Sequence, residues 1–137
     1  MLQGLTRDRA LLDAALDRIS VAQTMRLDLA VEAGRGELEG DRGDAGNAKV
    51  LVLLTDGRAN PVGPEVAVRK AQAAKDARIT IFTIGLGDDL DVDALAAMAS
   101  TPDRFYRAPD GGQLAEIYRR IAVALPCAAG QFWARRP

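Results

Sequence analysis

The sequence predicts an α/β fold in which a doubly wound parallel sheet carries helices on both faces. Two short apolar runs, residues 49–55 and 78–85, lack the alternation of a half-exposed strand. Such continuous runs are typical of strands that are covered on both faces. Segments with apolar residues at helical spacing surround and separate these runs, which favours parallel strands joined by helices. With 137 residues, the chain has the length of one domain.

Two helices are expected before the first strand. The first covers about residues 7–20, where apolar side chains recur at helical spacing and Thr6 is the expected N-cap. The second covers about residues 24–36 and has a broad apolar face. Five glycines between Gly34 and Asn47 then predict a loop at the surface.

The rest of the chain alternates strands with helices, which gives three strands and about five helices in all. Pro64 suits a first helical position, and Asp91 is the expected N-cap of the following helix. The expected elements are, in order, a strand at 49–55, a loop at 56–61, a helix at about 64–77, a strand at 78–85, a helix at 92–99, a strand at 104–106 and a helix at 112–125.

The composition excludes several classes of function. The chain has 18 basic and 19 acidic residues, no histidine and one cysteine. Catalytic triads built on imidazole and histidine zinc sites are therefore excluded, and the balanced charge argues against binding of nucleic acid through its phosphates. Apolar runs such as residues 50–54 are far shorter than the roughly 20 residues of a membrane-spanning helix. Charged residues at 7–9 leave no readable secretion signal.

Asp56 is the first candidate for chemistry. It follows the first predicted strand directly, and ligands of open parallel sheets bind at the carboxyl ends of the strands. Magnesium takes oxygen ligands from carboxylates, hydroxyls and waters, so Asp56 is a candidate metal ligand. The alternative is that Asp56 and Gly57 form only a turn.

A second candidate loop follows the second strand. Gly85 and Gly87 resemble the start of a phosphate-binding loop, but Asp88 and Asp89 come next and would repel a phosphate. We therefore expect a structural turn at the rim of the site. Residues 106–107, at the end of the third strand, would either contact a partner or simply pack or face water.

The two main strands resemble those of a known family. The run "LLTDG" at residues 53–57 and the run "ITIFTIGLG" at residues 79–87 are similar to the fourth and fifth strands of a von Willebrand factor type A domain. The later helices and the third strand follow in the family's order, and the segment from Leu5 resembles the one after the family's third strand. The resemblance covers about residues 2–125 and implies a Rossmann-like fold, with residues 126–137 left as a C-terminal tail.

The resemblance also implies a metal site. In the family, a metal-ion-dependent adhesion site combines an Asp-x-Ser-x-Ser run, a threonine in a later loop and an aspartate after the fourth strand. Carried over to this chain, the ligands are Asp56 and Thr24, and the ion is Mg²⁺, Mn²⁺ or Ca²⁺. Thr24 is equally placed to be a helix N-cap, and the two roles are compatible. The expected rim that a partner contacts is formed by Gly57, Arg58, Asn60, Gly87 and Asp88.

The sequence departs from the family in its first part. The Asp-x-Ser-x-Ser run is absent, since Ser20 and Ser100 are the only serines. The family's first three strands, including the one that would pair with residues 49–55, are therefore expected to be missing. With two ligands in place of about five, the ion should bind weakly. The tail, with Cys127, Phe132 and Trp133, is expected to be solvated, or to anchor at a membrane surface or a partner.

The resemblance implies a non-catalytic protein-binding or adhesion module whose metal ion binds a carboxylate of the partner. One alternative is a magnesium-dependent phosphoryl-transfer enzyme, which needs a second acid two residues from its aspartate. Here those positions hold Leu54 and Arg58. The other alternative is a scaffold subunit of an intracellular metal-insertion or chaperone complex. A signal peptide upstream would favour the surface role over this one.

Overall fold

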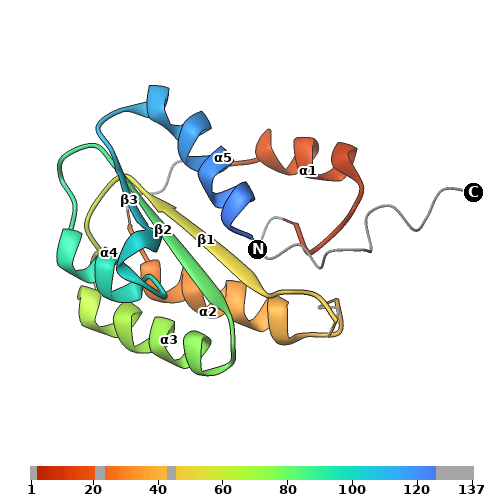
Figure 1. Ribbon diagram of the computed structural model, residues 1–137, viewed down its shortest axis with the longest axis horizontal. Helices are drawn as coiled ribbons and strands as arrows, with labels where there is room; N and C mark the ends of the chain where they lie inside the picture. Colours follow the sequence, from red (N-terminus) through yellow and green to blue (C-terminus); the bar gives the residue numbers. More distant parts are fainter. Residues whose placement is uncertain (1–2, 21–23, 43–45, 126–137) are drawn as a thin grey trace, which may run out of the picture.

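The structure is a computed structural model that describes residues 3–20, 24–42 and 46–125 (Figure 1). The C-terminal tail, with the expectations for Cys127, Phe132 and Trp133, lies outside the described residues. The elements are α1 (Arg9–Leu16), α2 (Leu27–Glu39), β1 (Val50–Thr55), α3 (Pro64–Asp76), β2 (Thr80–Leu86), α4 (Val92–Met98), the 3₁₀ turn η1 (Pro102–Arg104), β3 (Phe105–Ala108), the 3₁₀ turn η2 (Gly111–Gln113) and α5 (Leu114–Ala124).

The three strands form one parallel sheet in the order β1-β2-β3. Val50 of β1 is opposite Thr80 of β2, and Thr83 of β2 is opposite Phe105 of β3. Parallel neighbours need crossover connections, and α3 and α4 supply them. The predicted fold class, three parallel strands with five helices, is confirmed.

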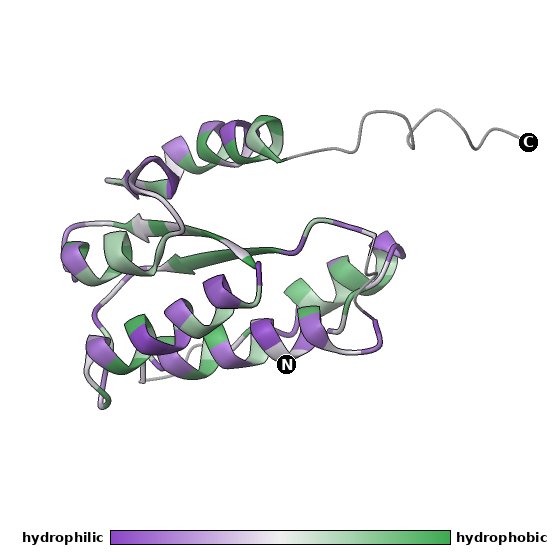
Figure 2. Ribbon diagram, turned by 60° about the horizontal axis from the view of Figure 1, so that its bottom comes forward, coloured by the Kyte–Doolittle hydropathy of each residue, from purple (hydrophilic) through white to green (hydrophobic). Residues whose placement is uncertain are grey.

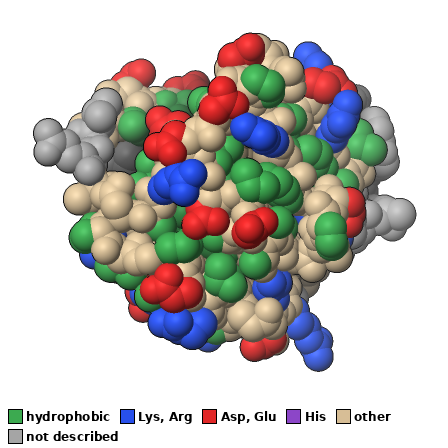
Figure 3. Space-filling view, turned by 90° about the vertical axis from the view of Figure 1, so that its left-hand side faces the viewer, with side chains coloured by type: hydrophobic (Ala, Val, Ile, Leu, Met, Phe, Trp, Pro, Cys, Tyr) green, Lys and Arg blue, Asp and Glu red, His purple; other side chains and the backbone are tan. Residues whose placement is uncertain are grey.

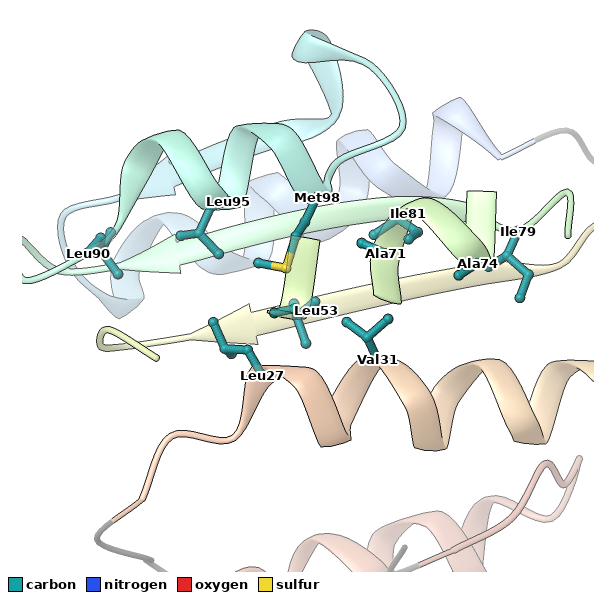
Figure 4. Packing of buried hydrophobic residues seen from close by; sticks show 11 residues of the cluster. Leu27, Val31, Leu53, Ala71, Ala74, Ile79, Ile81, Leu90, Leu95 and Met98 are labelled. Carbon is teal, nitrogen blue, oxygen red and sulfur yellow. The ribbon is translucent and has the colours of Figure 1, made fainter. Parts of the chain in front are cut away.

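Helices cover the sheet from both sides, as Figure 2 shows with α5 on one side and α2 and α3 on the other. The larger core cluster joins α2, α3 and α4 to one face of β1 and β2. In Figure 4, Leu27 and Val31 point from α2 toward Leu53 of β1. The smaller cluster packs Ile117 and Ile121 of α5 against the other face.

The two long strands differ in burial, although their sequences are similarly apolar. Five consecutive residues of β2, from Ile81 to Gly85, are buried, as predicted for a strand covered on both faces. In β1, Val52 is 36% exposed and Leu54 is 42% exposed. The prediction that β1 is covered on both faces is therefore wrong for Val52 and Leu54. On this face, Ile117 and Ile121 of α5 pack with residues of β2 and β3, and Val50 is the β1 residue of that cluster.

Two of the predicted helix boundaries need correction. The N-cap of α1 is Asp8, whose carboxylate accepts hydrogen bonds from the N–H groups of Ala10 and Leu11, rather than Thr6. Gly34 and Gly36 lie inside α2 and not in a loop. Asp91 caps α4 as predicted, accepting a hydrogen bond from Ala94 N–H.

Buried charges connect α2 to its surroundings. Asp28 is buried, accepts two hydrogen bonds from the guanidinium of Arg26 and lies 3.7 Å from Nζ of Lys70 on α3. The Arg26 hydrogen bonds hold the pKa of Asp28 well below its usual range. Glu37, near the end of α2, pairs with Arg42 and accepts a hydrogen bond from Leu5 N–H at 2.7 Å. These contacts fix α2 to α3 and to the first described residues.

Within the described residues, no helix combines the length and the apolar character that crossing a membrane would require.

Candidate metal centre at the carboxyl ends of the strands

The loops that follow β1, β2 and β3 gather at one end of the molecule, at the left of Figure 1. Figure 3 views this end directly. Acidic, basic and hydrophobic side chains are interspersed on it, and neither charge dominates. The expected site residues after the strands all belong to this end, because parallel strands bring their carboxyl ends to one edge.

Asp56 differs from the other charged side chains of these loops. Arg58 Nε lies 2.8 Å from Asp89 Oδ1, and Arg107 Nη2 lies 2.8 Å from Asp88 Oδ1. Asp56 is exposed, and within the described residues its carboxylate has neither a salt bridge nor a hydrogen bond. Asp56 thus presents an uncompensated carboxylate at the end of β1.

Thr24 lies before α2, in a stretch without regular secondary structure, and is exposed. The next residue, Met25, donates its N–H to Asn60 Oδ1 at 3.4 Å, and its carbonyl accepts from Asn60 N–H at 3.0 Å. The structure therefore joins the segment of Thr24 to the loop that carries Asp56. The reading of Thr24 as a helix N-cap is wrong, since α2 begins at Leu27 and Arg26 holds the cap position.

Thr55 supports this loop and was not among the predicted site residues. Its hydroxyl is buried, donates to Gly57 O at 3.1 Å, accepts from Gly57 N–H at 3.4 Å and lies 3.3 Å from the sulfur of Met25. A Cβ on Gly57 would meet Met25 Cε at an ordinary 3.6 Å, so packing within the described residues does not require a glycine at this position. The signal in the sequence that could have identified Thr55 is its place as the polar last residue of an apolar strand.

The loop after β2 is a tight turn, as predicted. Gly87 has a φ of +85° and donates its N–H to Ala108 O at 2.8 Å, which links the end of β2 to β3. The side chains of Leu90 and Leu95 pack against Gly85, and a Cβ there would lie 2.6 Å from Leu90 and 3.0 Å from Leu95. Both glycines therefore have structural reasons that require no phosphate.

The donor set fits a divalent hard cation in part. Asp56 and Thr24 offer a carboxylate and a hydroxyl, which are the oxygen ligands that magnesium and calcium prefer. Across the described ranges, no three His, Cys, Asp or Glu side chains group closely enough to hold a metal ion. Waters or groups from another molecule would have to complete the coordination.

The von Willebrand factor type A domain family model matches residues 3–120 of this chain. The chain belongs to this family. Among curated proteins, the human collagen alpha-1(XXI) chain is 38% identical to this domain over 58 residues, which are 42% of this chain and 6% of the collagen chain.

Solved structures agree with the assignment to the von Willebrand factor type A (VWA) family. One is proximal thread matrix protein 1 from the mussel byssus, whose MIDAS (metal-ion-dependent adhesion site) motif is occupied by zinc. It superposes with a TM-score of 0.71 at 22% identity, over 88% of this chain and 30% of the mussel protein. The pilus adhesin SpaC from Lactobacillus rhamnosus GG has a TM-score of 0.71 at 15% identity, over 85% and 21% of the two chains. The VWA domain of SpRpn10 has a TM-score of 0.67 at 16% identity, over 87% and 64%.

These structural similarities establish the fold. This VWA chain spans less than a third of the length of the mussel, pilus and collagen proteins. VWA domains are commonly protein-interaction modules that depend on a bound metal ion, and they are typically not enzymes.

Proposed function

We propose that this VWA chain is a non-catalytic protein-binding module that holds a divalent cation with Asp56 and Thr24 and uses it to bind a carboxylate of a protein partner. The cation is Mg²⁺, with Mn²⁺ or Ca²⁺ as substitutes that accept the same oxygen ligands. Adhesion through such a contact is the role we assign to the molecule.

The observation that carries this proposal is the free carboxylate of Asp56. The other charged side chains at these strand ends all have a partner within the described residues: Arg58 pairs with Asp89 and Arg107 with Asp88. Asp91 and Asp110 accept hydrogen bonds from the backbone N–H groups of Ala94 and Gly112. A single uncompensated, exposed carboxylate at a strand end attracts a cation more strongly than a neutralised pair does. The link between Met25 and Asn60 supports Thr24 as the second ligand.

A cation held by only two protein oxygens keeps several coordination positions for water. A partner carboxylate can replace one of these waters, and the ion then bridges two anionic groups that would otherwise repel each other. In this proposal, Gly57, Asn60 and Gly87 form the rim that the partner contacts, and Arg58 and Asp88, paired with Asp89 and Arg107, form a polar border. This arrangement supplies a directional, charge-dependent contact.

The residues near Asp56 also argue for binding rather than phosphoryl transfer. A second acid two residues away is absent, because these positions hold the exposed Leu54 and Arg58. The guanidinium of Arg58 is already bound to Asp89. We therefore assign no nucleophile and no general acid to this end of the sheet.

Isothermal titration with MgCl₂ tests the proposal. We expect weak binding, with a dissociation constant on the order of 1 mM, because the described residues supply only two ligands. Asp56→Asn should abolish the heat of binding. Asp76→Asn is the matched control, since Asp76 ends α3 at the opposite end of the sheet and should leave the binding unchanged. Equal binding by the Asp56→Asn variant would refute the assignment of the ligand.

A further inference from the structure

The side chain of Arg58 extends from the loop after β1 to the loop after β2. Its Nε donates a hydrogen bond to Asp89 Oδ1 at 2.8 Å, and Asp89 lies between β2 and α4. Strand β2 is the middle strand of the described sheet, with β1 on one side and β3 on the other. The ion pair of Arg58 and Asp89 therefore lies over the interior of the row of strand ends.

The backbone holds both members of this ion pair in place. The turn at Gly87, with its φ of +85°, precedes Asp89. Leu90 follows directly, is 4% exposed and belongs to the larger core cluster. On the other side of the pair, Asn60 Nδ2 donates to the backbone carbonyl of Arg58 at 3.3 Å. The guanidinium of Arg58 thus has a supported backbone behind it and an anchored acceptor beside it.

Most of the hydrogen-bond donors of Arg58 are open to another molecule. A guanidinium has five N–H donors, and within the described residues only Nε of Arg58 is engaged. Arg26, in contrast, uses both Nε and Nη2 to bind Asp28. The side chain of Arg58 is also 63% exposed. Its two outer nitrogens, Nη1 and Nη2, can therefore bind one carboxylate through two parallel hydrogen bonds while Nε stays on Asp89.

Arg58 is close in the chain to the proposed cation ligand. It follows Asp56 by two residues, so their Cα atoms are at most about 7 Å apart. In an extended peptide, side chains two residues apart point to the same side, and their Cα atoms are about 6.6 Å apart. These two separations match. One segment can therefore place an acidic side chain at the cation and its next-but-one neighbour at Arg58.

We propose that the partner is an extended segment with the pattern acid-x-acid, in which one carboxylate binds the cation at Asp56 and the other binds the outer nitrogens of Arg58. This inference rests on the proposed function and adds the chemical class of the partner. Asp89 is a positioning residue, because it holds the guanidinium through Nε and leaves the outer nitrogens open. Its carboxylate also offsets the charge of Arg58, which would otherwise repel the cation.

Arg107 is less suited to this role, although it is also exposed at this end of the sheet. Its Nη2, one of the two outer nitrogens, already donates to Asp88 Oδ1 at 2.8 Å. It also belongs to β3, two strands away from β1, which is roughly 10 Å across the sheet. A segment that reached Arg107 from Asp56 would need more than one residue between its two acids.

The test is an NMR titration of the ¹⁵N-labelled protein with three peptides, capped at both ends, in 10 mM MgCl₂. The first peptide contains Asp-Ser-Asp, the second contains Asp-Ser-Asn, and the third contains two Asp separated by three Ser. Affinities come from the shifts of the amide signals of residues 56–58 and 87–89. We expect the Asp-Ser-Asp peptide to bind about three- to fivefold more tightly than the other two, the gain of one well-oriented exposed ion pair.

Variants of the protein assign each carboxylate to its contact. In Arg58→Gln, the ratio between the affinities for Asp-Ser-Asp and Asp-Ser-Asn should fall to about one. Arg78→Gln is the matched control, because it removes the same charge from an exposed arginine just before β2, at the opposite end of the sheet. It should keep the wild-type ratio. Asp56→Asn, or EDTA in place of MgCl₂ at equal ionic strength, should abolish binding of the Asp-Ser-Asn peptide, which has only the cation to bind.

The acid-x-acid pattern and the proposed function fail through different results. Binding that depends on Mg²⁺ but is equal for Asp-Ser-Asp and Asp-Ser-Asn would overturn the pattern alone. A ratio that survives Arg58→Gln, or tighter binding of the peptide with three Ser, would do the same. A preference for Asp-Ser-Asp that requires Arg58 but persists in EDTA would uphold Arg58 and refute the cation contact. No binding of any peptide at 10 mM would overturn both.

Discussion

Among single residues, Glu37 illustrates how pairing changes the acidity of a carboxyl group. Its side chain is 9% exposed, bound to the guanidinium of Arg42 and to the backbone N–H of Leu5. These hydrogen bonds, with the Arg42 contact the largest cause, lower the pKa of Glu37 from 4.5 to about 2. The ionised form is therefore favoured in the folded protein over the unfolded chain.

This shift predicts a pH-dependent contribution to stability. A carboxyl group whose pKa is lowered by folding stabilises the protein fully above pH 4.5 and loses that contribution as the pH falls toward 2. Glu37→Gln should therefore lower the urea midpoint at pH 7, and the difference from the wild type should shrink between pH 4.5 and pH 2. A difference that stays constant over this range would show that Glu37 acts through packing and not through its charge.

Gly87 is the residue where backbone conformation limits substitution. Its φ of +85° lies in the region that disfavours residues with a Cβ, while a Cβ there would meet no atom within 4 Å. Gly87→Ala should therefore cost about 1–2 kcal/mol from backbone strain alone. Gly111→Ala is the matched control, because Gly111 also has open space around it but lacks a positive φ. Thermal melts that lower Tm equally for both variants would contradict this explanation.

Among the elements, α2 and β1 are in unusually close contact. A Cβ on Gly34 would lie 2.6 Å from Leu51 Cδ1, whereas a Cβ on Gly36, in the same helix, would meet nothing within 4 Å. Alanine at an exposed helix position gains about 0.8–1.0 kcal/mol over glycine. Gly36→Ala should therefore raise the free energy of unfolding by about this amount.

Gly34→Ala should lose that gain, because α2 or Leu51 has to move away. We expect the Gly34→Ala protein to be less stable than the Gly36→Ala protein by at least about 1 kcal/mol in urea unfolding. Equal stabilisation by both substitutions would mean that Leu51 moves aside at no cost.

The elements also show what the sequence could predict. The continuous apolar run of residues 79–85 identified the buried strand β2, and Asp91 identified the start of α4, because both signals are local. Gly34 and Gly36 lie where the predicted helix at 24–36 meets the loop predicted from five clustered glycines, and α2 continues past both to Glu39. The close approach of Leu51 explains a glycine at position 34. The apolar run of residues 49–55 does not show which neighbours cover it, so the exposure of Val52 and Leu54 is expected only from the absence of the family's first strands.

For the candidate site too, the sequence predicted the local features and not those that depend on residues far apart in the chain. Asp56 was predicted from its place after an apolar strand, and the structure puts it at the carboxyl end of β1. The neutralisation of Arg58 by Asp89 joins residues 31 positions apart and depends on the turn at Gly87. Such long-range pairs leave no pattern in the local sequence, so the isolation of the Asp56 carboxylate emerged only from the fold.

At the scale of the whole molecule, the two ends of β1 have opposite chemistry. The carboxyl end presents Asp56, and the amino end presents a hollow lined by Arg7, Arg42 and Lys49. Six strand residues separate the ends by about 20 Å. This separation exceeds the Debye length of about 8 Å at physiological salt, so the cations of the hollow should have little effect on cation binding at Asp56.

This separation gives a prediction for the titration with MgCl₂. Lys49→Gln should leave the Mg²⁺ affinity within about twofold of the wild type at constant ionic strength. A tenfold change would show that the two ends of β1 are coupled through the sheet.

The proposed function depends most on a cation that binds at the carboxyl end of β1. Paramagnetic broadening of backbone amide NMR signals by Mn²⁺ locates a bound ion even when its affinity is low. We predict that substoichiometric Mn²⁺ broadens the signals of Asp56, Gly57 and Thr24 first, and that Asp56→Asn removes this pattern while Asp76→Asn preserves it. Broadening centred on other acidic residues, or identical broadening in the Asp56→Asn protein, would contradict the account.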